Sequence, residues 1–280
     1  MVIIRIQGGL GNQLFQYALY ENFKAMGKLV KADTTSYRDG REKRELELER
    51  LGIELVEASQ EELHIYYANN SIWIDKVLRY TFGRKKYIKE NSYDFVPEIL
   101  KLDDGYLSGY WQSKKYFNDV EKEVRKNINF QNIRTDEVVL RKRQIEEQNS
   151  VSVHVRMGDY LQKPDMYSNI CTQEYYRKAF DYIAERVEKP IFYIFSDEPD
   201  KVEGMLEGYN YCMVTENRGR NSYKDMYLMS RCKHHIIANS TFSWWGAWLD
   251  KREEKIVITP SRWNNFCKGN EICCAGWVML

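Results

Sequence analysis

Short apolar runs alternate with helix-length segments through the second half of the chain, and this alternation restricts the possible folds more than any other feature. We expect strands at 151–156, 191–195, 211–214, 235–238 and 255–259, separated by helices near 173–187, 199–206, 222–231 and 243–250. Strands that alternate with helices in this way form a doubly wound parallel sheet. The second half is therefore predicted to be an α/β domain.

The first 33 residues predict a second unit of the same kind. An apolar run at 2–6 stops at a glycine turn, and a helical pattern at 14–26 leads to another strand at 29–33. In such a βαβ unit the glycine turn lies at the carboxyl edge of the sheet, where open sheets bind ligands. Gly9, Gly11 and Asn12 are candidate anion-binding residues, because glycines let backbone amides approach an anion at a helix N-terminus. A tight βα connection without a ligand is the alternative.

The length of 280 residues suggests about two domains. The sequence becomes polar between 131 and 149, so we place the boundary in the interval 130–150, with domains at 1–148 and 149–280. The mixed-charge run at 39–50 is expected to be solvated, and the segment 64–90 shows no clear periodicity.

Composition excludes several function classes. Lys and Arg number 42 against 41 Asp and Glu, a net charge of +1, so no overall field attracts nucleic acid and any anion must be bound locally. The six cysteines show no C-x-x-C spacing, which argues against a zinc site or a redox dithiol. With no apolar run of 18 residues, we expect a cytoplasmic protein that is soluble or at most peripheral at a membrane.

The strongest candidate site follows the strand at 151–156. Valines alternate there with Ser152, His154 and Arg156, so the three polar side chains share one face of the strand. A guanidinium offers five donors in a geometry that suits a diphosphate, and Asp159, on the turn that follows, is placed to accept a proton. The alternative is a structural ion pair between Arg156 and Asp159.

A cluster of hydroxyl residues precedes the helix expected at 243–250. Ser240, Thr241 and Ser243 lie where a strand passes into that helix, so they can bind phosphate together with the helix amides. A plain N-cap is the alternative interpretation. The tryptophans that follow are expected to pack in the core.

Two further carboxylates are candidates. Asp197 lies at the tip of the strand at 191–195, where ligand contact and an N-cap before Pro199 are equally reasonable roles. Asp225 lies on a predicted helix, and a lone helical acid is usually solvated. A carboxylate beside a purine pocket can, however, accept both N1–H and the 2-amino group of guanine.

Taken in order, five motifs resemble those of bacterial α-1,2-fucosyltransferases of glycosyltransferase family 11, over nearly the whole chain. Met157 departs from the family pattern, which usually has a second arginine at that position. The motifs are Gly8-Gly9-Leu10-Gly11-Asn12-Gln13-Leu14-Phe15-Gln16-Tyr17-Ala18, Gly109-Tyr110-Trp111-Gln112-Ser113, His154-Val155-Arg156-Met157-Gly158-Asp159-Tyr160, Phe195-Ser196-Asp197 and Asn239-Ser240-Thr241-Phe242-Ser243-Trp244-Trp245-Gly246.

The resemblance implies a GT-B fold, in which two Rossmann-like domains with parallel sheets face a central cleft. It implies inverting transfer of L-fucose from GDP-β-L-fucose to the 2-hydroxyl of a galactose residue in an oligosaccharide, as in surface-glycan synthesis. The C-terminal domain would hold the donor and the N-terminal domain the acceptor. The residue roles it implies are Arg156 on the β-phosphate, His154 and Asp225 on the guanine side, Ser240, Thr241 and Ser243 on the diphosphate, and a loop from Gly9 to Asn12 that closes over the donor.

Inverting transfer places negative charge on the departing diphosphate, which a guanidinium and helix amides can stabilise. The sequence contains no Asp-x-Asp, so we expect no metal and no cofactor apart from the donor substrate. Asp159 is the preferred general base, although its proximity to Arg156 also suits an ion pair. The alternatives are a fucosyltransferase that makes another linkage and a non-catalytic carbohydrate-binding protein. A Ser-His-Asp hydrolase is disfavoured, because no G-x-S-x-G occurs.

Overall fold

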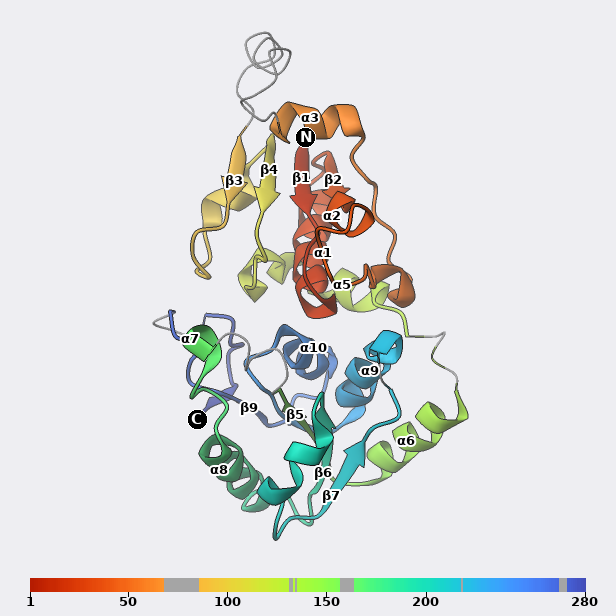
Figure 1. Ribbon diagram of the computed structural model, residues 1–280, viewed down its shortest axis with the longest axis vertical. Coiled ribbons are helices and arrows are strands. Elements are labelled where there is room, and N and C mark those ends of the chain that lie inside the picture. The colour runs from red at the N-terminus through yellow and green to blue at the C-terminus, as the bar shows by residue number, and fades with distance from the viewer. Residues whose placement is uncertain (68–85, 131–132, 134, 157–163, 218, 267–270) are drawn as a thin grey trace. The chain divides into compact units, whose positions relative to one another are not determined.

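The computed structural model describes the chain except for residues 68–85, 131–132, 134, 157–163, 218 and 267–270 (Figure 1). It divides into two compact units, Met1–Asn129 and Phe130–Leu280. The division falls at the early edge of the interval 130–150, so helix α6 (Asp136–Glu147) belongs to the second unit and not to the first. Val138 and Ile145 of α6 are buried there in one core with Leu228.

The first unit contains a four-stranded parallel sheet in the order β2-β1-β4-β3. Helix α1 (Leu10–Ala25) contacts β1 and β2, and α3 (Gln60–Tyr67) packs its Leu63 on Ile3 of β1. The expected strand, turn, helix and strand at the start of the chain are confirmed. Strand β3 and the second half of α3 fall in the segment that the sequence left unassigned. The strands are β1 (Val2–Arg5), β2 (Val30–Asp33), β3 (Tyr87–Lys89) and β4 (Gly105–Ser108), and the smaller helices include α2 (Thr35–Arg38) and α5 (Glu121–Asn127).

The second unit contains a six-stranded parallel sheet in the order β10-β9-β8-β5-β6-β7. All five strands predicted for this half are present, and the short strand β10 is additional. The strands are β5 (Ser150–Val155), β6 (Ile191–Ser196), β7 (Tyr211–Val214), β8 (His234–Ile236), β9 (Val257–Thr259) and β10 (Val278–Met279). The helices besides α6 are α7 (Pro164–Tyr167), α8 (Gln173–Ala184), α9 (Tyr223–Arg231) and α10 (Thr241–Leu249).

Helices cover both faces of the second sheet (Figure 1). The β5 valines pack on Tyr176 and Phe180 of α8, whereas Phe195 of β6 packs toward α6 and α9 on the other face. The helix predicted near 199–206 is wrong: the chain forms two short 3₁₀ turns, Pro199–Lys201 and Glu203–Met205. A glycine at 204 weakens a continuous α-helix there.

Strand order places one switch point in each sheet. In the second sheet the chain leaves β5 toward β6 and β7 and then returns to β8 on the other side of β5. In the first sheet it leaves β1 toward β2, and β4 later pairs with the other side of β1. Ligands of open α/β sheets bind at the carboxyl ends of the strands that flank such a point. The residues that follow β5 and β8, and those that follow β1 and β4, are therefore the places to examine.

Candidate functional site

Arg156 and Asp197 form an ion pair at the carboxyl edge of the second sheet. Arg156 directly follows β5 and Asp197 directly follows β6, and Nε of the arginine lies 3.5 Å from Oδ2 of the aspartate. Their side chains are 22% and 29% exposed, so both reach the surface at the switch point. The alternative of an ion pair between Arg156 and Asp159 stays a prediction. Residues 157–160, with Met157 and Asp159 among them, lie outside the described residues.

Asp197 does not cap the helical turn that follows it. The N-cap position of the turn at Pro199–Lys201 is Glu198, which makes no side-chain cap hydrogen bond. The hydroxyl of Ser196 accepts a hydrogen bond from the Glu198 amide at 3.1 Å. The N-cap alternative for Asp197 is therefore wrong, and its carboxylate is directed at the guanidinium.

His154, on β5, is two residues before Arg156, so their side chains lie on the same face of the sheet. The histidine is only 5% exposed. Its ring centroid lies 5.8 Å from that of Phe242 in α10, and its backbone carbonyl accepts a hydrogen bond from the Tyr176 hydroxyl at 2.9 Å. The imidazole is therefore held against the first turn of α10, close to the other predicted donor-binding residues.

The hydroxyl cluster begins α10 at the carboxyl end of β8. Ser240 occupies the N-cap position without a side-chain cap hydrogen bond, and Thr241 is the first helical residue. Ser243 is buried and donates its hydroxyl to the Ser240 carbonyl at 3.2 Å. Ser240 is thus the N-cap residue by position, but its hydroxyl makes no cap hydrogen bond. The first amides of a helix have no partner within the helix, and they carry its partial positive charge.

Asp225 lies in the first turn of α9, after β7 and at the same edge of the sheet. Asn217 donates its side-chain amide to Oδ1 of Asp225 at 2.8 Å. Burial raises the pKa of Asp225 to about 7, and the Asn217 hydrogen bond opposes this change. The usual solvated role of a helical acid does not apply here. Sequence reasoning missed Asn217, because a single asparagine in a loop carries no pattern.

Tryptophans and a glycine fix the helices that carry these residues. The three tryptophans of α10 are 0–2% exposed, which confirms the packing role expected for them. A Cβ atom on Gly246 of α10 would lie 2.8 Å from Cβ of Met229 in α9, so the glycine allows the two helices to approach closely. The contact packs α9, which carries Asp225, closely against α10, which carries Thr241. The tryptophans are Trp244, Trp245 and Trp248.

A buried Ser-His-Asp chain lies beneath this edge. The Ser152 hydroxyl lies 2.8 Å from Nδ1 of His235, and Nε2 of the same ring lies 3.1 Å from Oδ2 of Asp250. The three residues are 4%, 0% and 3% exposed, so no substrate reaches the serine. Burial lowers the pKa of His235 to about 4, although Asp250 acts in the opposite direction. The chain ties β5 and β8 to the end of α10.

Gly9, Gly11 and Asn12 begin α1 at the carboxyl edge of the first sheet. Gly8 has a φ of 80°, Gly9 is the N-cap, and the other two lie in the first helical turn. Oδ1 of Asn12 accepts a hydrogen bond from Nε2 of Gln112 at 2.8 Å. Two motifs that are about 100 residues apart in the sequence therefore meet across β1 and β4.

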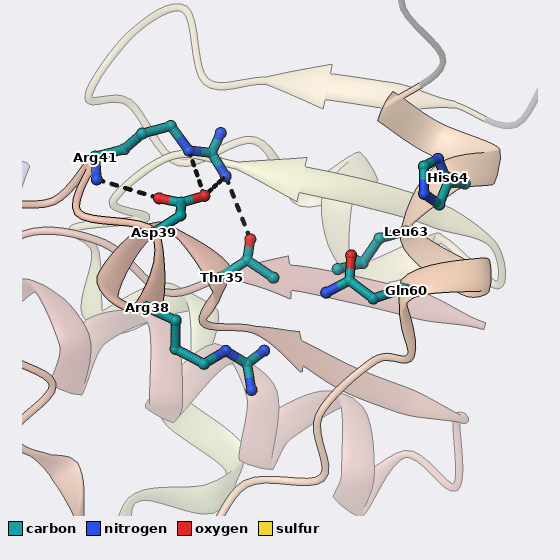
Figure 2. Close-up of a pocket in the computed structure, with 7 residues that line it drawn as sticks. All are labelled: Thr35, Arg38, Asp39, Arg41, Gln60, Leu63 and His64. Atoms are coloured by element: carbon teal, nitrogen blue, oxygen red, sulfur yellow. Dashed lines mark hydrogen bonds and ion pairs between the residues drawn. The ribbon is translucent and has the colours of Figure 1, made fainter.

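A pocket of about 370 Å³ lies elsewhere in the first unit, between α2 and α3 (Figure 2). Arg41 pairs there with Asp39 at 2.6 Å, and the Arg38 guanidinium lies 2.7 Å from Glu57. Both guanidiniums are thus already paired with carboxylates, and the pocket contains none of the predicted site residues. It is lined by Thr35, Arg38, Asp39, Arg41, Gln60, Leu63 and His64.

Across the described ranges, no three His, Cys, Asp or Glu side chains come together in a way that would hold a metal ion. Likewise, none of the helices in that part of the chain has the length and apolar character needed to cross a membrane.

Comparison with known proteins gives consistent matches. The model of glycosyl transferase family 11 matches residues 53–280. The whole chain is 32% identical to an alpha-1,2-colitosyltransferase of Escherichia coli, of which 99% is covered. It is 30% identical, over 98% of its length, to 99% of the O-antigen biosynthesis glycosyltransferase WbnK of Escherichia coli. A match of 28% identity spans 54% of the chain and 45% of galactoside alpha-(1,2)-fucosyltransferase 1 of Aotus azarae.

A solved structure confirms the predicted fold type. An Arabidopsis thaliana FUT1 mutant in complex with GDP aligns with 92% of the chain and 70% of that protein, with a TM-score of 0.52 and 12% identity. At this identity the likeness concerns the fold alone. Together with the two parallel sheets, it establishes a GT-B-type α/β protein with two Rossmann-like units.

Proposed function

Because the chain belongs to glycosyltransferase family 11, we propose that it transfers L-fucose from GDP-β-L-fucose to the 2-hydroxyl of a galactose residue in a surface glycan, with inversion. The observation that supports this proposal most strongly is Arg156, which places a partly exposed guanidinium at the switch point of a parallel sheet. The α-1,2 linkage in the names of two relatives supports the linkage, and the O-antigen role of a third supports the glycan class. We also propose that the enzyme is cytoplasmic and binds its acceptor at a membrane surface.

The reaction breaks the bond between C1 of fucose and the β-phosphate oxygen, and forms a bond from C1 to the galactose O2. Charge accumulates on the departing GDP as the first bond breaks. We assign its stabilisation to Arg156 and to the first amides of α10, which Ser240 and Thr241 introduce. A preorganised charge-assisted contact of this kind is worth on the order of 3–4 kcal/mol in the transition state.

We assign guanine recognition to Asp225. An ionised carboxylate accepts both the N1–H and the 2-amino group of guanine, and adenine does not present this pair of donors. Asn217 holds one carboxylate oxygen at 2.8 Å and so fixes the orientation of the other. In this assignment His154 lies on the guanine side and Ser243 supports the start of α10.

The galactose hydroxyl must lose its proton as the new bond forms. We propose that Asp159 accepts it, because this carboxylate is three residues from Arg156 in the sequence. We also propose that the donor substrate suffices without a metal ion, and that the loop from Gly9 to Asn12 contributes to donor binding.

Transfer of colitose is the second candidate function. The relative that is 32% identical over the whole chain is a colitosyltransferase. Colitose is 3-deoxy-L-fucose, so the two donors differ by one hydroxyl group at C3 of the sugar. A protein that prefers the GDP-linked deoxy sugar would have the same nucleotide site and a different sugar site.

The test is a transfer assay with purified protein in EDTA, with GDP-fucose and GDP-colitose as donors, galactose-terminated oligosaccharides as acceptors, and linkage determination by NMR. The proposal expects an α-1,2-fucosyl product and stabilisation of the protein by GDP but not by UDP. A colitosyl product alone would favour the second candidate. Stabilisation by free sugars without GDP binding would indicate a carbohydrate-binding protein, and activity that returns only with Mg²⁺ or Mn²⁺ would refute metal independence.

A further inference from the structure

Three buried side-chain atoms of the first unit have no hydrogen-bond partner within the described part of the chain: Nε of Arg5, Nε1 of Trp111 and Oε1 of Gln112. Arg5 is the last residue of β1, whereas Trp111 and Gln112 closely follow β4, the neighbouring strand. The three atoms therefore belong to residues at the switch point of the first sheet. Buried polar atoms are nearly always paired, so a cluster of exceptions at a ligand-binding edge points to a ligand.

The turn that contains two of these atoms is strained. Trp111 has a φ of 55°, a left-handed conformation that bulky residues rarely adopt, and it is 2% exposed. Such strain persists only where the surrounding structure imposes it, and it is concentrated at functional sites.

The Glu90 carboxylate imposes this conformation. Oε2 accepts a hydrogen bond from the Tyr110 amide at 2.6 Å, and Oε1 accepts one from the Trp111 amide at 2.9 Å. The Glu90 amide itself extends the β3–β4 pairing by donating to Ser108 at 2.9 Å. A Cβ atom on Gly109 would lie 2.4 Å from Cβ of Glu90, so the glycine permits this close approach. Burial raises the pKa of Glu90, and the two amide hydrogen bonds oppose that change.

The other side of the turn is attached to α1. Nε2 of Gln16 donates to the Gly109 carbonyl at 3.0 Å, and Nε2 of Gln112 donates to Asn12 at 2.8 Å. Because its donor group is used in this way, the Gln112 amide keeps its carbonyl oxygen as an available acceptor. The turn is therefore fixed from β3 on one side and from α1 on the other.

We propose that the turn at 109–112 binds hydroxyl groups of the acceptor saccharide and that Glu90 is its positioning residue. An indole N–H and an amide carbonyl on consecutive residues, Trp111 and Gln112, suit hydroxyls, which both accept and donate. A carbonyl oxygen repels phosphate, so this chemistry differs from that at Arg156. Tyr110, half-buried on the same turn, adds an aromatic surface of the kind that packs on sugar rings. The inference rests on the proposed transferase activity.

The experiment compares Glu90→Gln with wild-type protein by steady-state kinetics and GDP calorimetry. The glutamine keeps the size of the side chain but directs an NH₂ group at one of the two backbone amides. We expect the acceptor KM to rise by about tenfold, while the donor KM and the GDP Kd stay within about twofold of wild type. The matched control is Glu98→Gln, an exposed glutamate of the same unit, which should change nothing.

An unchanged acceptor KM in Glu90→Gln, or equal changes in acceptor and donor KM, would overturn the inference. If Glu90→Gln does not fold, Trp111→Phe decides the question: it removes the indole N–H, leaves the hydrogen bond from Gln112 to Asn12 in place, and should raise the acceptor KM alone. Failure of the proposed function is recognised separately, because wild-type protein would then form no fucosylated product.

Discussion

Nε of Arg156 and Oδ2 of Asp197 lie 3.5 Å apart at the carboxyl ends of the adjacent strands β5 and β6. At this distance and exposure the pair adds little to stability. The contact holds the guanidinium at the edge of the sheet, where we propose that it binds the donor diphosphate.

GDP affinity should depend on pH through Asp225. Its pKa of about 7 in the folded protein means that the carboxyl group is substantially protonated below neutrality. Guanine needs the ionised form as acceptor, so we expect GDP affinity to fall by up to about tenfold per pH unit below 7. Calorimetry at pH values from about 5.5 to about 8.5 measures this dependence.

Asp225→Asn provides the matched variant for that dependence. We expect a loss of roughly thirtyfold in GDP affinity at pH 8, equivalent to about 2 kcal/mol, and a much flatter profile of GDP affinity against pH. A steep GDP profile that persists in Asp225→Asn would exclude this carboxylate as the titrating group.

The same carboxyl group affects folding stability. Since the folded pKa of Asp225 is raised, the stability that its protonated form contributes is fully present below the unfolded pKa of 3.8 and is lost as the pH rises through about 7.

The buried Ser152, His235 and Asp250 should control stability and not turnover. Ser152→Ala removes the partner of the His235 ring nitrogen, so we expect a loss of about 1–3 kcal/mol in the free energy of unfolding with kcat within about twofold. The folded pKa of His235 is lowered to about 4 from 6.5, so its contribution is present above pH 6.5 and is lost as the pH falls through about 4. Urea titrations at several pH values measure both effects, and abolished turnover in a folded Ser152→Ala protein would give the serine a catalytic role.

Gly246→Ala should separate α9 from α10. The added methyl group meets Cβ of Met229 at 2.8 Å, a contact that requires movement of backbone, so we expect a loss of about 1–3 kcal/mol in unfolding free energy. GDP affinity should also fall, because these helices carry Asp225 and Thr241. The control is Gly204→Ala, where no atom lies within 4 Å of the new Cβ. Equal thermal stability of the two variants would contradict the expected contact.

Asp159→Asn tests the proposed general base. The amide cannot accept the hydroxyl proton, so we expect transfer to be abolished while donor affinity stays within about threefold of wild type. Single-turnover kinetics with a galactose-terminated acceptor, together with GDP calorimetry, separates the two effects. Turnover close to that of wild type would remove Asp159 from the mechanism.

The sequence predicted five of the six strands of the second sheet and the opening strand, turn, helix and strand of the first unit, because the signals of these elements are local. Valines at 151, 153 and 155 predicted β5, and the glycines at 8–11 predicted the turn into α1. Parallel topology then placed Arg156, Asp197 and the start of α10 at one edge without further information. By contrast, a helix was predicted near 199–206 where the chain forms separate 3₁₀ turns.

The contacts between distant residues were not predictable. Glu90 lies in a segment without periodicity, and its role depends on the positions of Tyr110 and Trp111 about 20 residues later. Asn217 is recognisable only beside Asp225, and the pairing of Arg156 with Asp197 joins residues of two different strands. Such pairs arise from tertiary packing, which produces no recognisable pattern of residue spacing in the sequence.

The central claim is that Arg156 receives the diphosphate of the donor, and GDP calorimetry on Arg156→Ala tests it most directly. The matched control is Arg143→Ala, which removes an exposed arginine paired with Glu147 on α6. We expect Arg156→Ala to lose GDP affinity, and the GDP affinity of the control to match that of wild type. The kcat/KM of Arg156→Ala should correspond to a loss of about 3–4 kcal/mol of transition-state stabilisation. GDP affinity equal to that of wild type in Arg156→Ala would contradict the claim.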